Sequence, residues 1–406
     1  MKLKVTKHNS IDLSLVMLLI FYLLFTIADL STSIQSGYKG ADRSGAHQYL
    51  LVLTGYLGIY VLFHLGNVKL RQPLTSLILI GIWALFVNLL NSVSTWNLLV
   101  QANMSVLWIL SYIFFEKIRK KEFASKSILY KTSFVLLLFY AATTVYSFFD
   151  MMVRLNRIPV LNVVYYGVSL IPWVMISINP KYKKAIFIIG MALVLLSMKR
   201  GAIIALPIML LADSFVEGRI KGSYKGLIKV ISYIVVFAIA IIITDKLSNG
   251  FISVRFSAEK LADGSGRSEQ YSTIISLIKN RGVMRFFFGG GCEEPIKILG
   301  TGIHNEWLNF LFCYGLIGAI LYAKLVIGFI KKSFSTLKTI PSLASACFMM
   351  TALYLVLSMV STGYGGYHGF WLFGFWGYLN AEIDKRSGYD KRAGGKTNET
   401  VQRRTV

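Results

Sequence analysis

Long apolar stretches separated by short polar segments run along almost the whole chain. A helix needs about 20 mostly apolar residues to cross a bilayer, and about twelve segments match or approach that length. They cover residues 11–30, 48–66, 74–92, 98–115, 132–150, 161–178, 185–198, 202–216, 230–244, 305–330, 340–360 and 370–380. The pattern predicts an all-α integral membrane protein with about twelve transmembrane helices.

One polar segment, residues 245–303, is far longer than the others and lies between the ninth and tenth predicted helices. Two packed helices need only a short connection, so a long ordered one is usually functional. Within it, the spacing of Ile274, Ile275 and Ile278 predicts a short amphipathic helix over residues 271–279. The following run Gly289–Gly291 predicts a break in regular structure.

Composition agrees with a membrane protein, because 55% of the residues are hydrophobic and only 15% are charged, whereas soluble domains are about a quarter charged. The net charge of +24 would suggest nucleic acid as a partner of a soluble protein. No basic face interleaved with aromatic residues stands apart from the apolar segments, so we expect no nucleic-acid partner.

The positions of Lys and Arg predict the orientation of the chain. With the Lys-rich N-terminus in the cytoplasm, basic residues concentrate in alternate connections such as 116–131 and 217–229, as the positive-inside rule requires. Both termini are then cytoplasmic, and residues 245–303 form one large extracytoplasmic loop. Residues 1–380 form the transmembrane domain. Residues 381–406 form a basic cytoplasmic tail whose polar composition is typical of disorder.

Several familiar motifs are missing from the sequence. It has no Walker loop, dinucleotide fingerprint, paired-carboxylate motif or zinc-ligand spacing, so we expect no cofactor and no metal. Cys292, Cys313 and Cys347 are odd in number and lack metal-ligand spacing, so they imply no disulfide framework. The candidate chemistry therefore depends on other side chains of the outer face.

The tenth apolar segment opens with His304, Asn305 and Glu306. This order places an imidazole at the membrane surface on the first turn of a helix, where the helix dipole disfavours the protonated ring. A neutral imidazole can accept a proton from a substrate hydroxyl. The alternative interpretation is an interfacial histidine that only caps the helix.

Cations on the outer face are the second candidate feature. Lys199 and Arg200 lie at an outer turn against the positive-inside trend, and Gly201 would let the backbone turn sharply there. Arg255 and Arg267 in the large loop offer planar forks that bind phosphate oxygens bidentately. These residues form a candidate diphosphate clamp. The alternatives are a snorkelling pair at the turn and ordinary solvated charges in the loop.

Other polar residues of the outer face have simpler interpretations. Lys279, Arg281 and Arg285 are expected to meet lipid headgroups or solvent. His368 lies in a segment rich in Gly and Tyr, which could stack on a sugar or form an interfacial aromatic belt. The sequence favours the belt.

Several motifs on this face occur in a fixed order along the chain. They are Ser197 to Gly201 between two mid-chain helices, Ser265-Gly266-Arg267 with Tyr271, Gly289 to Gly291, and His304-Asn305 followed after nine residues by Gly315-x-x-Gly318. This set resembles the signature of the bacterial O-antigen polymerase and O-antigen ligase superfamily. The resemblance covers residues 185–330 by motif and the rest of the chain by topology.

The resemblance implies a multi-pass glycosyltransferase of the bacterial inner membrane that uses undecaprenyl-diphosphate-linked glycans and needs no metal. His304 would activate the acceptor sugar hydroxyl, while Arg200 and Arg267 would hold the diphosphate of the donor. The additional substrate-binding candidates are Lys199, Arg255 and Asn305.

Polymerases and ligases of this superfamily use the same kind of donor and differ in the acceptor. We favour polymerisation of oligosaccharide repeat units on the outer face, for O-antigen, capsule or exopolysaccharide, with ligation to a lipid core as the alternative. A flippase for the same lipid-linked unit is a further alternative, which predicts charged residues inside the helices, such as Lys324. The expected partners are the lipid-linked donor, a glycan acceptor and membrane lipids, with a chain-length regulator and a flippase as candidate protein partners.

Overall fold

The computed structural model describes residues 9–35, 44–63, 69–120, 126–156, 160–176, 182–222, 225–257 and 267–402. Every regular element within these ranges is a helix. The helices are α1 (Asn9–Gln35), α2 (Ser44–Phe63), α3 (Leu74–Leu90), α4 (Thr95–Lys120), α5 (Lys126–Phe149), η1 (Asp150–Arg154), α6 (Val164–Met175), α7 (Lys183–Ser197), α8 (Arg200–Lys221), α9 (Lys225–Leu247), α10 (Phe251–Arg255), α12 (Arg267–Lys279), α13 (Val283–Phe288), α14 (Glu294–Leu299), α15 (Glu306–Thr339), α16 (Pro341–Val360) and α17 (Gly369–Gln402). Each apolar segment predicted from the sequence overlaps one of these helices, which confirms the all-α class.

Several helices have the length and composition of membrane spans. In the described part of the chain, 6 helices are long and apolar enough to cross a membrane: Leu15–Gln35, Thr95–Lys120, Lys131–Arg154, Arg200–Ile220, Glu306–Thr339 and Pro341–Val360. Exposed isoleucines also follow one another along α9, including Ile231, Ile239 and Ile242. Such surfaces are unfavourable in water and favourable against lipid. The chain is therefore an all-α, multi-pass membrane protein.

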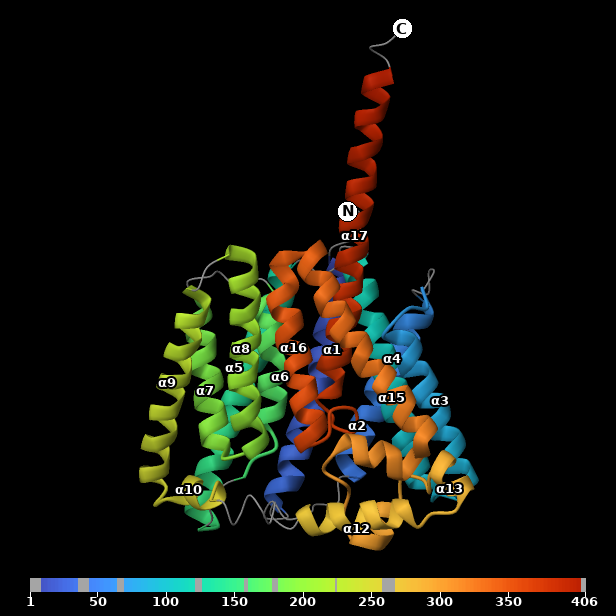
Figure 1. Cartoon of the computed structure of the whole chain (residues 1–406), viewed down its shortest axis with the longest axis vertical. Helices are drawn as coiled ribbons and strands as arrows, with labels where there is room; N and C mark the ends of the chain where they lie inside the picture. The colour runs from blue at the N-terminus through green and yellow to red at the C-terminus, as the bar shows by residue number, and fades with distance from the viewer. Residues whose placement is uncertain are drawn as a thin grey trace, which may run out of the picture.

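The helices lie side by side (Figure 1), and the largest side chains buried between them are aromatic. α17 packs along α4, and α16 lies between α8 and α15. Trp173 of α6 and Trp371 of α17 are both buried, and the Trp173 indole donates a hydrogen bond to the Trp371 carbonyl at 3.0 Å. Large buried rings with a satisfied N–H group contribute strongly to such contacts.

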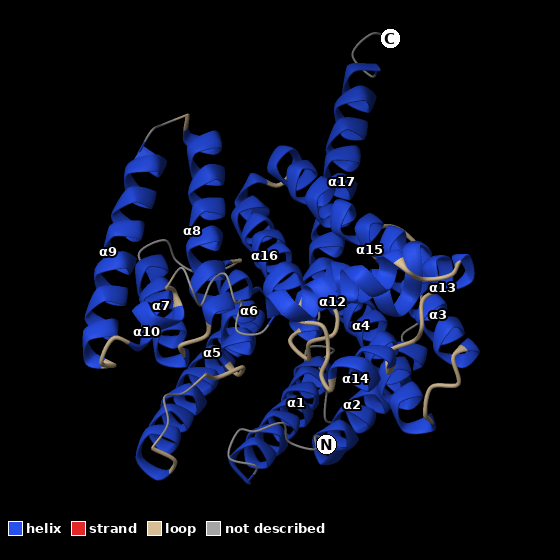
Figure 2. Ribbon diagram, turned by 60° about the horizontal axis from the view of Figure 1, so that its bottom comes forward, coloured by secondary structure: helices blue, strands red, loops and turns tan. Residues whose placement is uncertain are grey.

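The long segment after α9 folds into short helices across one end of the bundle. α10, α12 and α13 lie at the end opposite to the part of α17 that projects from the bundle (Figure 1), and the turned view brings this end forward (Figure 2). The predicted amphipathic helix is confirmed as part of α12, which begins earlier, at Arg267, and buries Ile274.

Glycines allow this end segment to lie directly against α15. The Gly291 N–H donates to the Cys313 carbonyl at 2.9 Å. Gly289 and Gly315 both have positive φ, and a Cβ on Gly315 would lie 2.2 Å from the Phe287 carbonyl oxygen. Glycine alone tolerates both the conformation and the close approach. The glycine run predicted as a break therefore also docks the segment on a kink in α15.

Arg281 strengthens this docking. Its guanidinium lies 3.7 Å from the centre of the Phe312 ring and donates to the Phe312 carbonyl at 2.5 Å. It also forms an ion pair with Glu294. The side chain is only 6% exposed, so the expectation that Arg281 meets headgroups or solvent is wrong.

The C-terminal helix extends into the predicted tail. α17 continues as one helix from Gly369 to Gln402, through most of the segment 381–406 that was expected to be disordered. Glu382 is buried and pairs with Arg119 of α4, and Asp384 pairs with Arg71. These ion pairs tie the first residues of the segment 381–406 to the bundle, and disorder of the rest of the tail stays a prediction.

Candidate functional site

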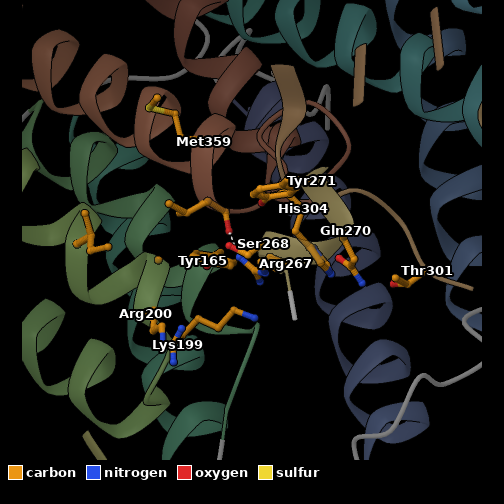
Figure 3. Close-up of a pocket in the computed structure, with 13 residues that line it drawn as sticks. Tyr165, Lys199, Arg200, Arg267, Ser268, Gln270, Tyr271, Thr301, His304 and Met359 are labelled. Carbon is orange, nitrogen blue, oxygen red and sulfur yellow. Dashed lines mark hydrogen bonds between the residues drawn. The ribbon is translucent and has the colours of Figure 1, made fainter. Parts of the chain in front are cut away.

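A cavity of about 520 Å³ opens at the end of the bundle where α12 lies (Figure 3). Its wall includes Tyr165 of α6, Lys199 and Arg200 at the start of α8, Arg267 at the start of α12, and His304 just before α15. None of the described residues that line it is acidic. The fold thus gathers cations from distant segments around one imidazole.

A second cavity of about 420 Å³ adjoins the first. The loop between α16 and α17 forms much of its remaining wall, together with Asp29 of α1 and Asn162. Lining residues shared by the two cavities are Tyr165, Lys199, Arg267 and His304. His304 therefore borders both spaces.

A tight turn between α7 and α8 brings two of the cations to the cavity. Met198 takes a left-handed conformation there, with φ of 50°. The Lys199 ammonium lies 5.9 Å from the centre of the Tyr165 ring, and the Arg200 guanidinium lies 5.9 Å from the centre of the Phe256 ring. Cation–π attraction at such distances holds both head groups near the cavity.

Gly201 has a different role from the predicted one. The sequence suggested that Gly201 turns the backbone, but it lies inside α8, and Met198 takes the left-handed conformation. A Cβ on Gly201 would lie 2.4 Å from the Tyr165 hydroxyl oxygen and 2.9 Å from a methyl carbon of Val360. Gly201 therefore lets α8 approach α6 and the end of α16 at the wall of the cavity.

The first turns of α12 position two groups of the site. The Arg267 guanidinium donates to the Val360 carbonyl at 2.8 Å, at the C-terminal end of α16. This end carries partial negative charge, which favours a cation. One turn later, the Tyr271 hydroxyl donates to the His304 carbonyl at 3.1 Å. α12 thus fixes both a cation and the backbone of the histidine.

His304 precedes α15 rather than lying on its first turn, because Asn305 is the N-cap and the helix starts at Glu306. His304 is exposed to the cavity but partly desolvated by its wall, which lowers the pKa of His304 to about 4, and Arg267 and Lys199 contribute to the lowering. The neutral state expected at pH 7 therefore follows from partial desolvation and nearby cations. A neutral imidazole open to the cavity can accept a proton.

Two other sequence candidates lie elsewhere. Asn305 caps α15, since its side chain accepts the Leu308 N–H at 3.0 Å and donates to the Met359 carbonyl at 3.3 Å. It is not among the lining residues of either cavity. Arg255 ends α10, and its side chain lies outside the described residues. Substrate binding by these two residues stays a prediction.

Glu306 is a residue of the site region that the sequence analysis did not single out. Its carboxylate is fully buried and accepts the backbone N–H groups of Gly363, Tyr364 at 2.6 Å and Gly365 at 2.8 Å. Glu306 is also the first residue of α15, where the helix dipole favours negative charge. An acidic residue in the first turn of an apolar helix was the available signal.

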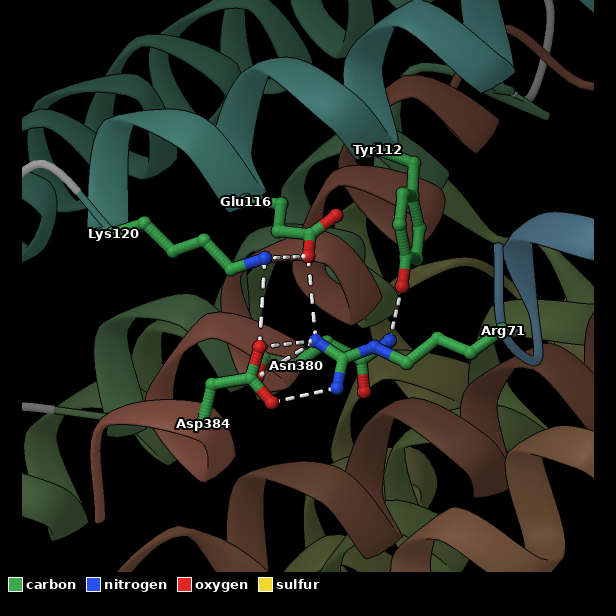
Figure 4. Close-up of polar contacts among 6 residues, drawn as sticks. All are labelled: Arg71, Tyr112, Glu116, Lys120, Asn380 and Asp384. Atoms are coloured by element: carbon green, nitrogen blue, oxygen red, sulfur yellow. Dashed lines mark hydrogen bonds and ion pairs between the residues drawn. The ribbon is translucent and has the colours of Figure 1, made fainter. Parts of the chain in front are cut away.

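A separate group of charged side chains, drawn in Figure 4, joins residues before α3, at the end of α4 and in α17, away from α12. Arg71 donates to both carboxylate oxygens of Asp384, at 2.6 and 2.8 Å, and to Glu116 at 3.3 Å. Lys120 contacts the same two carboxylates. Both signs of charge are present and paired, so this cluster ties α4 to α17 and to the start of α3.

The cavity combines a cationic wall with a neutral imidazole. Cations stabilise negative charge as it develops on a phosphate leaving group, and an imidazole can take the proton of an attacking hydroxyl. In the part of the chain that the structure describes, no three His, Cys, Asp or Glu side chains gather where they could hold a metal ion.

No protein-family model and no curated protein matches the chain.

Proposed function

We propose that the protein is a membrane glycosyltransferase that polymerises undecaprenyl-diphosphate-linked oligosaccharide repeat units on the outer face of the bacterial cytoplasmic membrane. The observation that carries the proposal is the cavity that Lys199, Arg200 and Arg267 line together with His304. The motifs that resemble those of O-antigen polymerases and ligases support the same substrate class. The proposed enzyme uses no metal and no cofactor.

In the proposed reaction, an acceptor hydroxyl attacks the anomeric carbon of the lipid-linked donor. The hydroxyl oxygen forms the new glycosidic bond while the bond from that carbon to the diphosphate oxygen breaks. The hydroxyl proton moves to His304, and the electron pair leaves with the lipid diphosphate. Lys199, Arg200 and Arg267 bind the diphosphate and stabilise the charge that it gains.

The proposal includes an orientation in the membrane. About twelve helices would span it, both termini would be cytoplasmic, and residues 245–303 would form the extracytoplasmic loop that helps to build the site. Support comes from the basic segment 116–131, which begins in the last turns of α4. This end of α4 carries Lys120 and lies at the end of the bundle away from α12. Such basic connections favour the cytoplasmic side.

Substitutions in the cavity test the proposal in cells that depend on this protein for their polymer. His304→Ala and Arg267→Ala should each abolish long polymer, while single lipid-linked repeats accumulate on the outer face of the membrane. Lys279→Ala is the matched control, because Lys279 is an exposed cation of the same helix as Arg267. That variant should make normal polymer.

Normal polymer from membrane-inserted His304→Ala would overturn the proposal. Repeats that accumulate on the inner face would indicate a flippase. Normal polymer that is no longer joined to a core lipid would indicate a ligase, which would use the same donor and a different acceptor.

A further inference from the structure

The second cavity, of about 420 Å³, differs in chemistry from the cation-lined one. Its wall combines a carboxylate, an amide, hydroxyls, aromatic rings and a second histidine. The residues beyond those shared with the first cavity are Asp29, Asn162, Tyr166, Ser361, Thr362, Gly365, Gly366, Tyr367 and His368. Donors and acceptors in several directions beside ring faces match a neutral sugar, which presents hydroxyls at its edge and C–H groups on its faces.

His368 is the most informative residue of this wall. The sequence favoured an interfacial belt for it, but the side chain is only 5% exposed, with its ring 5.7 Å from that of Tyr165. Burial lowers the pKa of His368 to about 4, and a hydrogen bond with the Thr362 backbone opposes the change. The ring is therefore neutral, and we assign the donor in this bond to Nδ1 because Nε2 has no partner among the residues that the structure describes.

This arrangement leaves Nε2 of His368 as a hydrogen-bond acceptor. Nε2 is buried and has no hydrogen-bond partner among the described residues. A buried polar atom without a partner is unfavourable, so such a site favours a ligand that supplies a donor. A sugar hydroxyl in the second cavity would supply it.

The loop that carries His368 is fixed before any ligand binds. The Glu306 carboxylate accepts three of its backbone N–H groups, as described above. The Tyr367 hydroxyl is hydrogen bonded to Nε2 of His47 of α2 at 2.8 Å. A preformed wall lowers the entropy lost on binding.

The two cavities also differ in charge and in apolar lining. Arg200 lines only the cation cavity, together with Ile204 and Met359, which are 40% and 61% exposed and suit a lipid chain. Asp29 lines only the second cavity, where its negative charge offsets one of the two cations, Lys199 and Arg267, that line both cavities. His304, which borders both, would lie between a donor in one and an acceptor in the other.

We infer that the second cavity binds the uncharged terminal sugar of the acceptor glycan, with Nε2 of His368 accepting a hydrogen bond from one of its hydroxyls. This inference rests on the proposed function, since it needs the donor diphosphate in the cation cavity. It assigns the acceptor site to the loop between α16 and α17 and to Asn162, just before α6.

Binding measurements on the full chain in lipid nanodiscs test the inference. The two probes are undecaprenyl diphosphate and the oligosaccharide released by mild acid from the lipid-linked repeat of the same cells. His368→Gln and Asn162→Ala should each weaken oligosaccharide binding about tenfold, as expected for the loss of one hydrogen bond. Both should bind undecaprenyl diphosphate as the wild type does. Asn162 is exposed, so its variant tests the site even if His368→Gln fails to fold.

The outcomes separate this inference from the function on which it rests. Unchanged oligosaccharide binding in the folded variants, or equal weakening of both probes, would overturn the acceptor site. Arg200→Gln should show the reverse pattern, with weaker binding of undecaprenyl diphosphate alone. If Arg200→Gln left that lipid bound as tightly as before, the donor assignment and the proposed function would fail, whatever the oligosaccharide did.

Discussion

At the scale of single residues, His304 is controlled by the charges that face it. Arg267 and Lys199 both disfavour its protonated form, in addition to partial desolvation. A bound diphosphate would offset these cations and raise the pKa of the imidazole. His304 would then be a stronger base when the donor is bound and a weaker base when it is absent. This coupling would limit proton transfer in the absence of substrate.

The first prediction concerns the protonation of His304 in the free protein. Diethyl pyrocarbonate acylates neutral imidazole, so the pH dependence of this reaction at His304, followed by peptide mass spectrometry, reports its pKa. The midpoint should lie near pH 4 in the wild type. Arg267→Gln removes a cation that lowers the pKa, so its midpoint should move upward, whereas Lys279→Gln should leave it in place. A wild-type midpoint near the ordinary value of about 6.5 would contradict the expected environment.

The second prediction concerns Glu306. Glu306→Gln replaces one carboxylate oxygen by an amide NH2 group that faces backbone N–H donors, so at least one buried donor loses its acceptor. The expected loss of stability is about 1–3 kcal/mol, seen as a lower midpoint of thermal unfolding in detergent. Glu269→Gln on the exposed face of α12 is the control and should unfold like the wild type. Equal midpoints for both variants would mean that Glu306 does not hold the loop.

At the scale of elements, the positions of the helices follow from the sequence, and the contacts between loops and helix ends do not. An apolar run of about 20 residues has few alternatives to a helix, so each predicted segment overlaps one. The break between α7 and α8 was also expected, but Met198 rather than Gly201 takes the unusual conformation. Gly201 is required by Tyr165 and Val360, which are close only in the folded chain.

In the candidate site, too, some residues could be predicted from the sequence and others could not. Lys199, Arg200, Arg267 and His304 stood out as cations and an imidazole on the outer face, and the structure brings them to one cavity. Glu306 did not stand out, because its partners are backbone groups more than 50 residues later, in a loop whose path no local pattern fixes.

The third prediction tests how the end segment docks on α15. Gly315→Ala would strain a positive φ and place a Cβ 2.2 Å from the Phe287 carbonyl oxygen, so it should lower both stability and polymer synthesis. Gly328→Ala in the same helix is the matched control. Its Cβ would meet only the Gln72 side chain, at 3.4 Å, so that variant should be neutral or more stable by up to about 1 kcal/mol. Unfolding midpoints of the two purified variants give the comparison, and a Gly315→Ala protein as stable as Gly328→Ala would refute the docking.

At the scale of the whole molecule, the two ends of the bundle differ in charge arrangement. The end with α12 holds a cavity whose described lining is cationic, while the other end holds paired acids and bases around Arg71. Ile204 and Met359 expose apolar side chains at the wall of the cavity. A lipid-linked donor could therefore keep its chain in the bilayer while its diphosphate reaches the cations from the side.

The fourth prediction tests this orientation directly. Lys279 of α12 and Lys338 of α15 are exposed near opposite ends of the bundle, so cysteines placed there report the two faces. Cys313 and Cys347 are buried, and Cys292 is replaced by Ser to lower the background. A membrane-impermeant maleimide should label Lys279→Cys in cells with an intact inner membrane. It should label Lys338→Cys only after that membrane is permeabilised.

The reverse pattern would place the cavity on the cytoplasmic side of the membrane. The basic connections would then lie on the outer side, against the positive-inside rule. Labelling of both sites in intact cells would exclude a bundle that separates them across the membrane.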